Sequence, residues 1–568
     1  MKTYPSDTTF APADLDGGDW SSIEPLYTAL LERAIDSAAD LEQLLLDRSE
    51  LDATVGEARG DRYIEMTRHT DDEAITKAYL QFVEELEPKL KDLGFKLDRR
   101  IVQSEHADAL DQGRWGLYLK GIDADVTLFQ EENIALQVDE TKLSQQYSEL
   151  NGAMTVQFQG QERTMAQLNP FLQETDRDVR EAAWRTAAER RHVDNEQLDS
   201  IFDDLVKLRG TMAHNADLED YRAYAFKAMH RFDYGPEHCN AFHQAVEQVC
   251  VPLLHEMNEE RRQSLGVDVL RPWDLGVDVL GRDPLRPFQN AEELIEKTSL
   301  LFNGMDSELG GLFDSMREGD SLDLESRKGK APGGYQYDRE RMRRPFIFMN
   351  AAGTHGDVQT MIHEAGHAFH ALLSRDEALL AYRHPPIEFA EVASMGMELL
   401  AAPGLTGFYN EDDAARARRE HLEGIINTLC WVATIDAYQH WLYTRDTSTK
   451  DQRDVYWLEL HARFGPNVSW DGLEQYHTKL WHKQLHLFEV PFYYIEYGIA
   501  QLGALQLWLN AMQDPEAALE AYRAALKLGG SRPLPELFEA AGLTFDFGPE
   551  TVSGLADALR SELQALPA

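Results

Sequence analysis

Apolar residues recur every three or four positions over the first part of the chain. Ile23, Leu26, Leu30, Ala34, Ala38, Leu41 and Leu45 follow this spacing, which predicts one amphipathic helix. Ser22 is placed as its N-cap, and Pro25 is tolerated in the first turn. Ala74, Ala78, Phe82 and Leu86 repeat the pattern until Pro88 interrupts it. The first quarter therefore reads as a layer of helices.

The pattern changes at residues 154–165. Met154, Val156 and Phe158 alternate with polar residues, and Gln159-Gly160 offers a turn, so we expect a short β-hairpin. Helical periodicity returns after Asp176, a good capping residue, and continues to about Leu265.

A strand followed by a helix is predicted near the middle of the chain. The basic segment Arg327–Tyr335 has the composition of a loop, and the apolar, aromatic run Pro345–Asn350 has the length of a strand. Thr354 and Asp357 then resemble a capping box. A helix is therefore expected to start at this point.

That helix carries the sequence His363-Glu364-Ala365-Gly366-His367. A spacing of four residues places both imidazoles on one helix face, where they can share a metal ion. Two neutral imidazoles suit Zn²⁺, and the neighbouring Glu364 can act as a general base toward water. The alternative is a chance match on a surface helix.

A zinc site of this type needs a third protein ligand, usually a carboxylate on a following helix. Glu388 and Glu391 lie 21 and 24 residues after His367, and spacing alone does not choose between them. Glu398, seven residues beyond Glu391, is either a group that orients a ligand or an exposed residue. His370 is too far along the helix to join His363 directly, and His355 is a lone loop histidine.

The segment His486–Tyr497 is rich in hydroxyl and imidazole groups. It contains Tyr493, Tyr494, Tyr497 and Glu496 besides His486. Such donors can stabilise the oxyanion of a tetrahedral intermediate, and Tyr494 and Tyr497 would share a helix face. The alternative is an aromatic packing cluster. The zinc motif upstream favours the donor role.

Composition limits the partners. The chain has 568 residues with 99 acidic and 55 basic side chains, a net charge of −44, which repels nucleic acid and anionic membranes. No run is apolar enough to span a bilayer, and residues 1–7 lack the apolar core of a secretory signal. Cys239, Cys250 and Cys430 form no paired motif. We expect a globular cytoplasmic protein without nucleic-acid or membrane partners.

Several separated motifs resemble oligoendopeptidase F, the bacterial branch of the thimet oligopeptidase family of zinc metallopeptidases. The resemblance is dense from about Asp176 to Gly503 and weaker over the first 110 residues. The motifs are Gly333-Gly334-Tyr335, Phe346–Asn350, Gly353-Thr354 with Gly356-Asp357, His363–His370, Ala390-Glu391-Val392-Ala393-Ser394 and His486–Tyr497.

The resemblance implies a mostly α-helical, two-lobed gluzincin fold with a deep substrate channel and a small edge sheet beside the metal-binding helix. An N-terminal helical lobe would span residues 1–193 and a catalytic domain residues 194–568. Phe346–Asn350 would pair with extended substrate backbone, as edge strands do. Short unfolded peptides would be the substrates, and the protein would be a monomer or a weak homo-oligomer.

The resemblance also implies residue roles. One zinc ion per chain would be held by His363, His367 and Glu391, with Glu364 as general base and proton shuttle. Substrate and oxyanion would be bound by His486, Tyr494 and Tyr497, with Tyr497 first for the oxyanion. Tyr493, Ala352 and Gly353 complete the expected substrate-binding set.

Two alternatives remain beside an oligoendopeptidase. One is an exopeptidase of the same family, a peptidyl-dipeptidase or carboxypeptidase. A related zinc carboxypeptidase family expects His-Glu-Ser-Gln where this chain has Ala390-Glu391-Val392-Ala393, which disfavours that assignment. The other is an inactive peptide-binding relative, which would have lost Glu364 or a ligand, and this chain has lost none.

Overall fold

The computed structural model describes residues 9–445 and 447–567. Its contacts divide the chain into unit 1, residues 1–127, 285–414 and 503–545, and unit 2, residues 128–284, 415–502 and 546–568. The boundary expected after residue 193 falls inside unit 2 and stays a prediction. The expectation about a secretory signal concerns residues 1–7, outside the described part.

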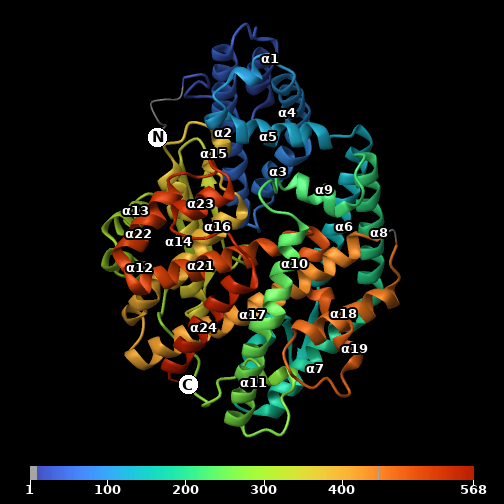
Figure 1. Cartoon of the computed structure of the whole chain (residues 1–568), viewed down its shortest axis with the longest axis vertical. Coiled ribbons are helices and arrows are strands. Elements are labelled where there is room, and N and C mark those ends of the chain that lie inside the picture. Colours follow the sequence, from blue (N-terminus) through green and yellow to red (C-terminus); the bar gives the residue numbers. More distant parts are fainter. Residues whose placement is uncertain (1–8, 446, 568) are drawn as a thin grey trace. The chain divides into compact units, whose positions relative to one another are not determined.

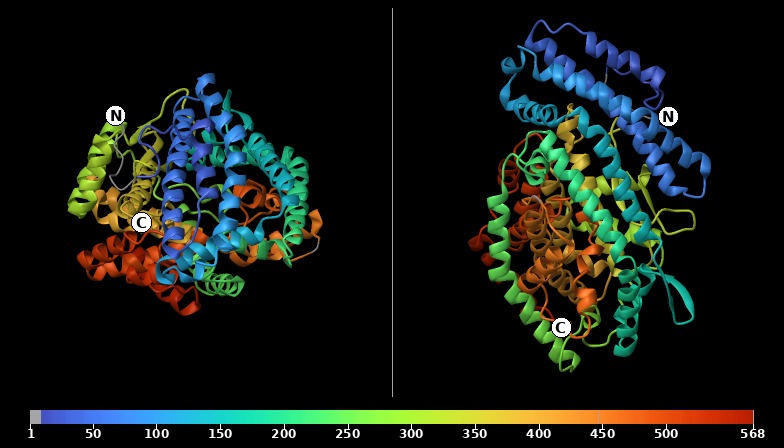
Figure 2. Two further views of the ribbon diagram at one scale, coloured as in Figure 1. Left: turned by 90° about the horizontal axis from the view of Figure 1, so that it is seen from above. Right: turned by 90° about the vertical axis from the view of Figure 1, so that its right-hand side faces the viewer.

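Unit 1 is mainly helical, as predicted for the fold class, with one small sheet (Figure 1). Its helices are α1 (Trp20–Glu32), α2 (Ala38–Arg68), α3 (Glu73–Gln81), α4 (Glu87–Val102), α5 (Gln112–Leu128), α12 (Ala291–Met305), α13 (Ser307–Glu318), α14 (His355–Ser374), α15 (Leu380–Arg383), α16 (Ile387–Ala401), α22 (Pro515–Leu526) and α23 (Leu534–Ala540). Short 3₁₀ segments are Ala107–Ala109 and Ala402–Gly407. Figure 2 shows α1, α2 and α4 side by side in blue.

The single helix expected from Ser22 to Leu45 is wrong. Asp19, not Ser22, caps α1, because its carboxylate accepts from the backbone N–H of Ser21, while Ser22 only donates its hydroxyl to Asp19. The chain leaves the helix after Glu32, and Ser37 caps a new helix. Local capping therefore outweighs the continuous apolar spacing.

Pro88 does not end the second predicted helix. A π-helical turn, Phe82–Leu86, joins α3 to α4, and Pro88 occupies the first turn of α4. Proline cannot donate the regular hydrogen bond of an α-helix, and here it lies just after the wide turn, where that regular pattern is already interrupted. The chain is thus helical from Glu73 to Val102 with one wide turn.

The sheet of unit 1 has the order β3 (Leu322–Glu325), β5 (Arg344–Ala351), β4 (Tyr335–Arg339). β5 pairs in parallel with β3 and antiparallel with β4. The predicted strand Phe346–Asn350 exists, but the expectation that it is an edge strand is wrong, because both of its sides are paired. The edges of this sheet are β3 and β4.

Unit 2 is also mainly helical. It contains α6 (Glu131–Gly152), α7 (Arg177–Val193), α8 (Asn195–Asn215), α9 (Tyr221–Ala228), α10 (Pro236–Ala245), α11 (Val251–Leu265), α18 (Lys450–Phe464), α19 (Glu474–His477), α20 (Leu485–Glu489) and α24 (Pro549–Ala565), with a π-turn at Val246–Cys250 and 3₁₀ segments at Ala166–Gln173, Pro272–Asp274 and Leu480–Lys483. Helices α17 (Glu411–Tyr443) and α21 (Ile495–Gln513) belong partly to each unit.

The predicted hairpin is confirmed in unit 2. β1 (Thr155–Phe158) pairs antiparallel with β2 (Gln161–Thr164), and both turn residues, Gln159 and Gly160, have positive φ. The hairpin is the teal pair of strands in the right-hand view of Figure 2. The predicted capping of α7 by Asp176 is confirmed as well.

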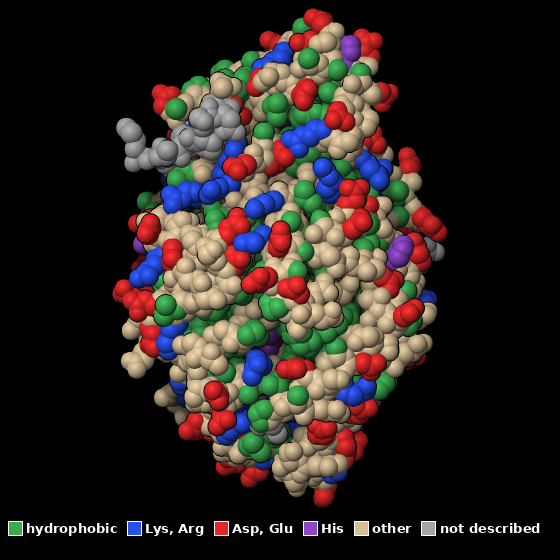
Figure 3. All heavy atoms as spheres, turned by 60° about the vertical axis from the view of Figure 1, so that its left-hand side comes forward, with side chains coloured by type: hydrophobic (Ala, Val, Ile, Leu, Met, Phe, Trp, Pro, Cys, Tyr) green, Lys and Arg blue, Asp and Glu red, His purple; other side chains and the backbone are tan. Residues whose placement is uncertain are grey.

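Acidic side chains spread over the face of the molecule in Figure 3, with basic side chains between them. This is the pattern of a solvated surface. None of the described helices is long and apolar enough to cross a membrane.

Candidate metal centre

Helix α14 starts where the sequence predicts. The hydroxyl of Thr354 accepts from the backbone N–H of Asp357, and the Asp357 carboxylate accepts in return from the N–H groups of Thr354 and Ala352. This capping box satisfies free N–H groups at the helix start. It also fixes the exit of β5 into the helix that carries His363 and His367.

Three potential metal ligands converge in unit 1. Nε2 of His363 lies 3.4 Å and Nε2 of His367 lies 3.8 Å from Oε2 of Glu391. One donor atom from each residue lies within 4.8 Å of the others. Glu388, the competing candidate, is not in this group. Two imidazoles and one carboxylate are the protein ligands of a catalytic zinc site that keeps an open position.

Gly366 allows this convergence. A Cβ atom at Gly366 would lie 2.6 Å from the carbonyl oxygen of Ala393 and 2.6 Å from Cα of Ser394. Only glycine therefore lets α14 approach the backbone of α16 this closely. The sequence analysis missed this role, although a glycine inside a helix between two histidines is a signal of close packing.

Two side chains of α16 hold the ligands in place. Oε1 of Glu398 lies 2.6 Å from Nδ1 of His363, and the hydroxyl of Ser394 donates to Oε2 of Glu391 at 2.9 Å. A carboxylate on the far nitrogen fixes the tautomer of a ligating imidazole. Of the two interpretations of Glu398, the structure favours the orienting one; Ser394 was missed.

The two histidines have opposite electrostatic surroundings. Burial disfavours the charged form of His363, but the hydrogen bond and charge of Glu398, with Glu391 and Glu364, raise its pKa to about 9. Burial and the charge of His363 lower the pKa of His367 to about 3. Without a metal, His363 is thus protonated and His367 neutral at pH 7.

Glu364 is a buried carboxyl beside the ligands. Burial, opposed by the charge of His363, raises its pKa to about 7, and the backbone N–H of Gln336 donates to it. A carboxyl with a pKa near neutrality can both accept and release a proton at physiological pH.

The remaining histidines of α14 do not join the donor group. His370 is buried, its ring packs against Phe389 with centroids 5.8 Å apart, and burial lowers its pKa to about 3. Nδ1 of His355 lies 2.8 Å from the Tyr409 hydroxyl. His370 is therefore a buried core histidine, in agreement with the expectation that it does not join His363 in binding the metal.

The predicted substrate-binding residues belong to both units. Ala352 and Gly353 connect β5 to α14 in unit 1, where Gly353 has a φ of +81° that favours glycine. The N–H of Ala352 is already bound to Asp357. His486, Tyr493, Tyr494 and Tyr497 lie in unit 2.

The residues of unit 2 form one aromatic cluster. The His486 ring lies 4.7 Å from that of Tyr494 and 5.9 Å from that of Tyr497, and the two tyrosine rings are 5.5 Å apart. Tyr493 is 5.5 Å from Tyr497. Tyr494 precedes α21, so the shared helix face expected for Tyr494 and Tyr497 is wrong, although their rings are in contact.

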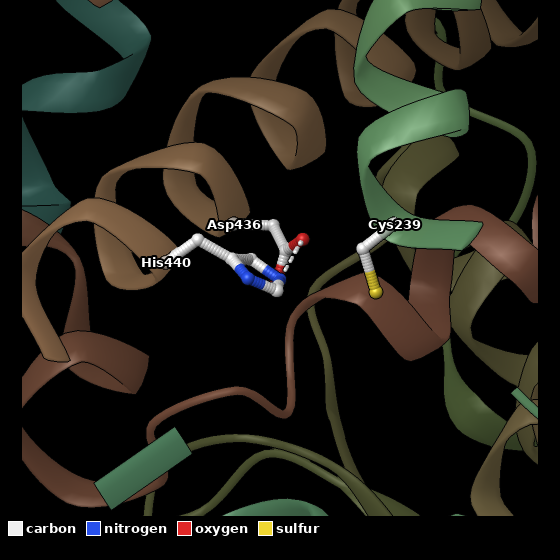
Figure 4. Close-up of side chains that lie close together, drawn as sticks. All are labelled: Cys239, Asp436 and His440. Atoms are coloured by element: carbon white, nitrogen blue, oxygen red, sulfur yellow. Dashed lines mark ion pairs between the residues drawn. The ribbon is translucent and has the colours of Figure 1, made fainter. Parts of the chain in front are cut away.

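A second group of donors in unit 2 consists of Cys239, Asp436 and His440 (Figure 4). All three are buried, and Asp436 lies 2.8 Å from Nε2 of His243 and 3.3 Å from Nε2 of His440. Despite burial, these imidazoles lower the pKa of Asp436. A buried carboxylate that lies against two imidazoles accounts for the arrangement. The spacing of Asp436 and His440, four apart on α17, was its sequence signal.

Comparison with known proteins places these features in a family. The sequence pattern of Peptidase family M3 matches residues 171–550, and that of the Peptidase M3 N-terminal domain matches residues 10–129. The structure of PZ peptidase A with inhibitor 2 has 28% sequence identity and a TM-score of 0.89, and the alignment covers 98% of this chain and 99% of that chain.

Curated relatives match over a shorter range. Group B oligopeptidase PepB of Streptococcus agalactiae is 25% identical over 289 residues, 50% of this chain and 46% of the relative. An oligoendopeptidase F homolog of Lactococcus lactis is 23% identical over 305 residues, 52% of this chain and 49% of the relative. The matched part thus spans about half the length of these relatives. The resemblance to oligoendopeptidase F is confirmed.

Proposed function

The chain belongs to peptidase family M3, and we propose that it is a zinc-dependent oligoendopeptidase that hydrolyses internal bonds of short, unfolded peptides. The observation that carries this proposal is the convergence of His363, His367 and Glu391 beside the buried Glu364. Two imidazoles, one carboxylate and an adjacent general base are the parts of a metal-dependent hydrolase.

The donor set fits zinc. Zn²⁺ accepts nitrogen and oxygen ligands, and the group offers two imidazoles and one carboxylate that Glu398 and Ser394 already orient. We propose one zinc ion per chain, held by His363, His367 and Glu391. When bound, zinc supplies a Lewis acid that lowers the pKa of water and polarises the scissile carbonyl.

Glu364 would move the proton of the reaction. Its carboxylate accepts a proton from the attacking water and then donates it to the leaving amine. The pKa of about 7 suits both steps, because the group changes protonation state near neutral pH. The N–H of Gln336 stabilises the charged form and fixes the carboxylate between steps.

The substrate backbone would pair with β4, and not with β5 as the sequence analysis expects. β4 is an edge strand, and the backbone N–H of its residue Gln336 donates to Glu364. A peptide extended along this edge would hydrogen-bond to β4, which would place its scissile bond beside the general base. Ala352 and Gly353, at the end of the same sheet, would border the substrate.

We assign the aromatic cluster of unit 2 to substrate binding and oxyanion stabilisation, on the family resemblance. Gln484 lies 2.7 Å from Nδ1 of His486, which orients the imidazole. Burial raises the pKa of Tyr494, so its hydroxyl remains a hydrogen-bond donor. Tyr497 would donate to the oxyanion, with His486, Tyr493 and Tyr494 holding the substrate.

We propose that the protein is cytoplasmic. Its three cysteines are buried and unbridged, which is usual in a reducing cytoplasm. A monomer or weak homo-oligomer stays a prediction.

The proposal is tested with quenched peptides and purified protein. We expect one zinc per chain, loss of cleavage after chelation and recovery with added zinc. Cleavage of peptides blocked at both ends distinguishes an endopeptidase from the exopeptidase alternative, since an exopeptidase needs a free terminus. A zinc-loaded protein that binds but never cleaves peptides would instead support an inactive relative.

A further inference from the structure

Unit 2 contains a cavity of about 260 Å³ that the proposed chemistry does not use. Residues of α7, of the 3₁₀ segment Ala166–Gln173 and of the segment 476–483 line it. One part of its wall is apolar and consists of Leu168, Leu172, Trp184, Leu198 and Leu480. The volume suits a small organic molecule.

Arg191 and Lys483 also line the cavity. Within the described part of the chain, no carboxylate oxygen lies within 4.0 Å of either cation. Arg191 donates to the amide oxygen of Asn151, at 3.3 Å. Lys479, a third cation of the same cavity, differs because it pairs with Asp199 and Asp454 at 2.9 Å each.

The charge of Arg191 disfavours the charged form of Lys483. Part of the Lys483 side chain is exposed to solvent and Arg191 is half-buried, yet the surrounding protein and the charge of Arg191 lower the pKa of Lys483, and burial lowers the pKa of Arg191. The chain has 99 acidic and 55 basic side chains, so a concave site with two uncompensated cations runs against its overall charge. An anion between them would offset both costs.

We propose that this cavity binds a small carboxylate that carries an apolar group. The carboxylate would lie between Arg191 and Lys483, and the apolar group would lie against Leu168, Leu172 and Trp184. Two sources present this chemistry, a free organic acid and the C-terminal end of a peptide. The inference rests on the cavity alone and does not depend on zinc chemistry.

The cavity also contacts the aromatic cluster through a short chain of side chains. The Lys483 ammonium lies 5.1 Å from the ring centroid of Trp431. Nε1 of Trp431 donates to Oε1 of Gln484 at 2.8 Å, and Nε2 of Gln484 lies 2.7 Å from Nδ1 of His486. A ligand that moves Lys483 therefore perturbs a neighbour of the proposed substrate-binding histidine.

The first test compares two ligands on the unaltered, zinc-free full chain by isothermal titration calorimetry. N-acetyl-L-leucine presents a carboxylate and an apolar group, and N-acetyl-L-leucinamide has the same shape without the charge. We expect the acid to bind at least about 10-fold more tightly, because charge-assisted hydrogen bonds are lost in the amide. Equal affinities, or no binding of the acid, would overturn the proposal.

Variants then locate the binding. Arg191→Gln and Lys483→Gln should each weaken binding of the acid at least about 10-fold. Arg190→Gln is the matched control, because Arg190 adjoins Arg191 in sequence but pairs with Asp194 and lies outside the cavity lining. Its affinity should match that of the parent. If one cavity variant fails to fold, the other decides, and unchanged affinity in a folded variant contradicts the site.

The source of the carboxylate is identified with peptides. A hexapeptide ending in leucine, with a free or an amidated C-terminus, is titrated into the Glu364→Gln variant, which should not consume it. Tighter binding of the free acid, lost in Arg191→Gln/Glu364→Gln, supports a peptide C-terminus as the occupant. Binding of N-acetyl-L-leucine alone supports the same site with a free acid. If the peptidase proposal fails, both possible occupants of the cavity, a free acid and a peptide C-terminus, can still be tested in this way.

Discussion

Oε1 of Glu398 lies 2.6 Å from Nδ1 of His363, on the side of the ring opposite the potential metal-binding nitrogen. In the neutral form that can bind a metal, Nδ1 donates to this carboxylate and Nε2, which faces Glu391, carries the lone pair. Glu398 therefore acts on the metal centre through the tautomer and orientation of His363.

Replacing Glu398 with Gln should lower the zinc affinity about 10-fold to 100-fold without removing a ligand. Competition with a metal chelator measures this affinity directly.

Glu388→Gln is the control, since Glu388 lies on the same helix outside the donor group. It should retain the parent affinity, whereas Glu391→Gln should lose far more than Glu398→Gln. Loss of zinc in Glu388→Gln with retention in Glu391→Gln would reverse the ligand assignment.

Zinc binding should displace a proton from His363 at pH 7. The pKa of His363 is raised to about 9, so this imidazole is mainly protonated at pH 7, and ligation requires the neutral form. His367, with a pKa lowered to about 3, is already neutral. Calorimetric titration in buffers of different ionisation enthalpy measures the released protons.

The direction of the shift in the pKa of His363 determines how the proton release depends on pH. Because the pKa of His363 is raised, the release should fall as the pH rises through 9. Glu398→Gln removes the main group that raises this pKa, so it should reduce the release at pH 7. Equal release by both proteins at pH 7 would argue against the His363 assignment.

Gly366→Ala should separate α14 from α16. The added methyl would lie 2.6 Å from the Ala393 carbonyl oxygen, and overpacking of this kind costs about 1 to 3 kcal/mol. Urea unfolding should show the loss, and zinc affinity should fall with it.

Gly311→Ala is the matched control for Gly366→Ala. Gly311 lies in α13, and a Cβ there meets nothing within 4 Å. Alanine should stabilise this exposed helix by up to about 1 kcal/mol. A Gly366→Ala protein as stable as the parent would show that the helices do not need this contact.

The ion pairs of Asp323 should make part of the free energy of unfolding depend on pH. Its carboxylate binds Arg68, Arg327 and Lys330 at 2.6 to 2.9 Å, and these partners outweigh burial and lower its pKa. A depressed pKa stabilises the fold above the unfolded value of about 3.9, and this stabilisation is lost as the pH falls below it.

Asp323→Asn should therefore cost about 3 kcal/mol at pH 7, as expected for breaking a buried ion pair. The difference from the parent should shrink below pH 4 in urea unfolding. The control Asp92→Asn removes an exposed pair with Lys96 and should cost under about 1 kcal/mol. A difference for Asp323→Asn that is independent of pH would contradict the ion-pair account.

Local patterns predicted the helices of the first quarter, the hairpin and the start of α14, because spacing and capping act between neighbours in sequence. The fold class was predicted from the family resemblance. The break between Glu32 and Ser37 was missed because competing caps decided it. The central place of β5 was missed because its parallel partner, β3, lies more than 15 residues upstream. Pairing between distant strands leaves no local pattern.

The candidate metal centre shows the same limit. The spacing of His363 and His367 predicted the pair but left Glu388 and Glu391 open as the third ligand. The family resemblance implied Glu391, and in the fold it is Glu391 whose carboxylate lies beside the two imidazoles. The cavity cations, Arg191 and Lys483, could not be predicted, because only the fold brings these two distant residues to one cavity.

The most direct test of the central claim is the rate of peptide cleavage by zinc-loaded Glu364→Gln. The amide preserves size but cannot take the proton of water, so kcat should fall at least about 1,000-fold with zinc content unchanged at one per chain. Glu364→Gln that holds zinc and cleaves peptides at the parent rate would contradict the account.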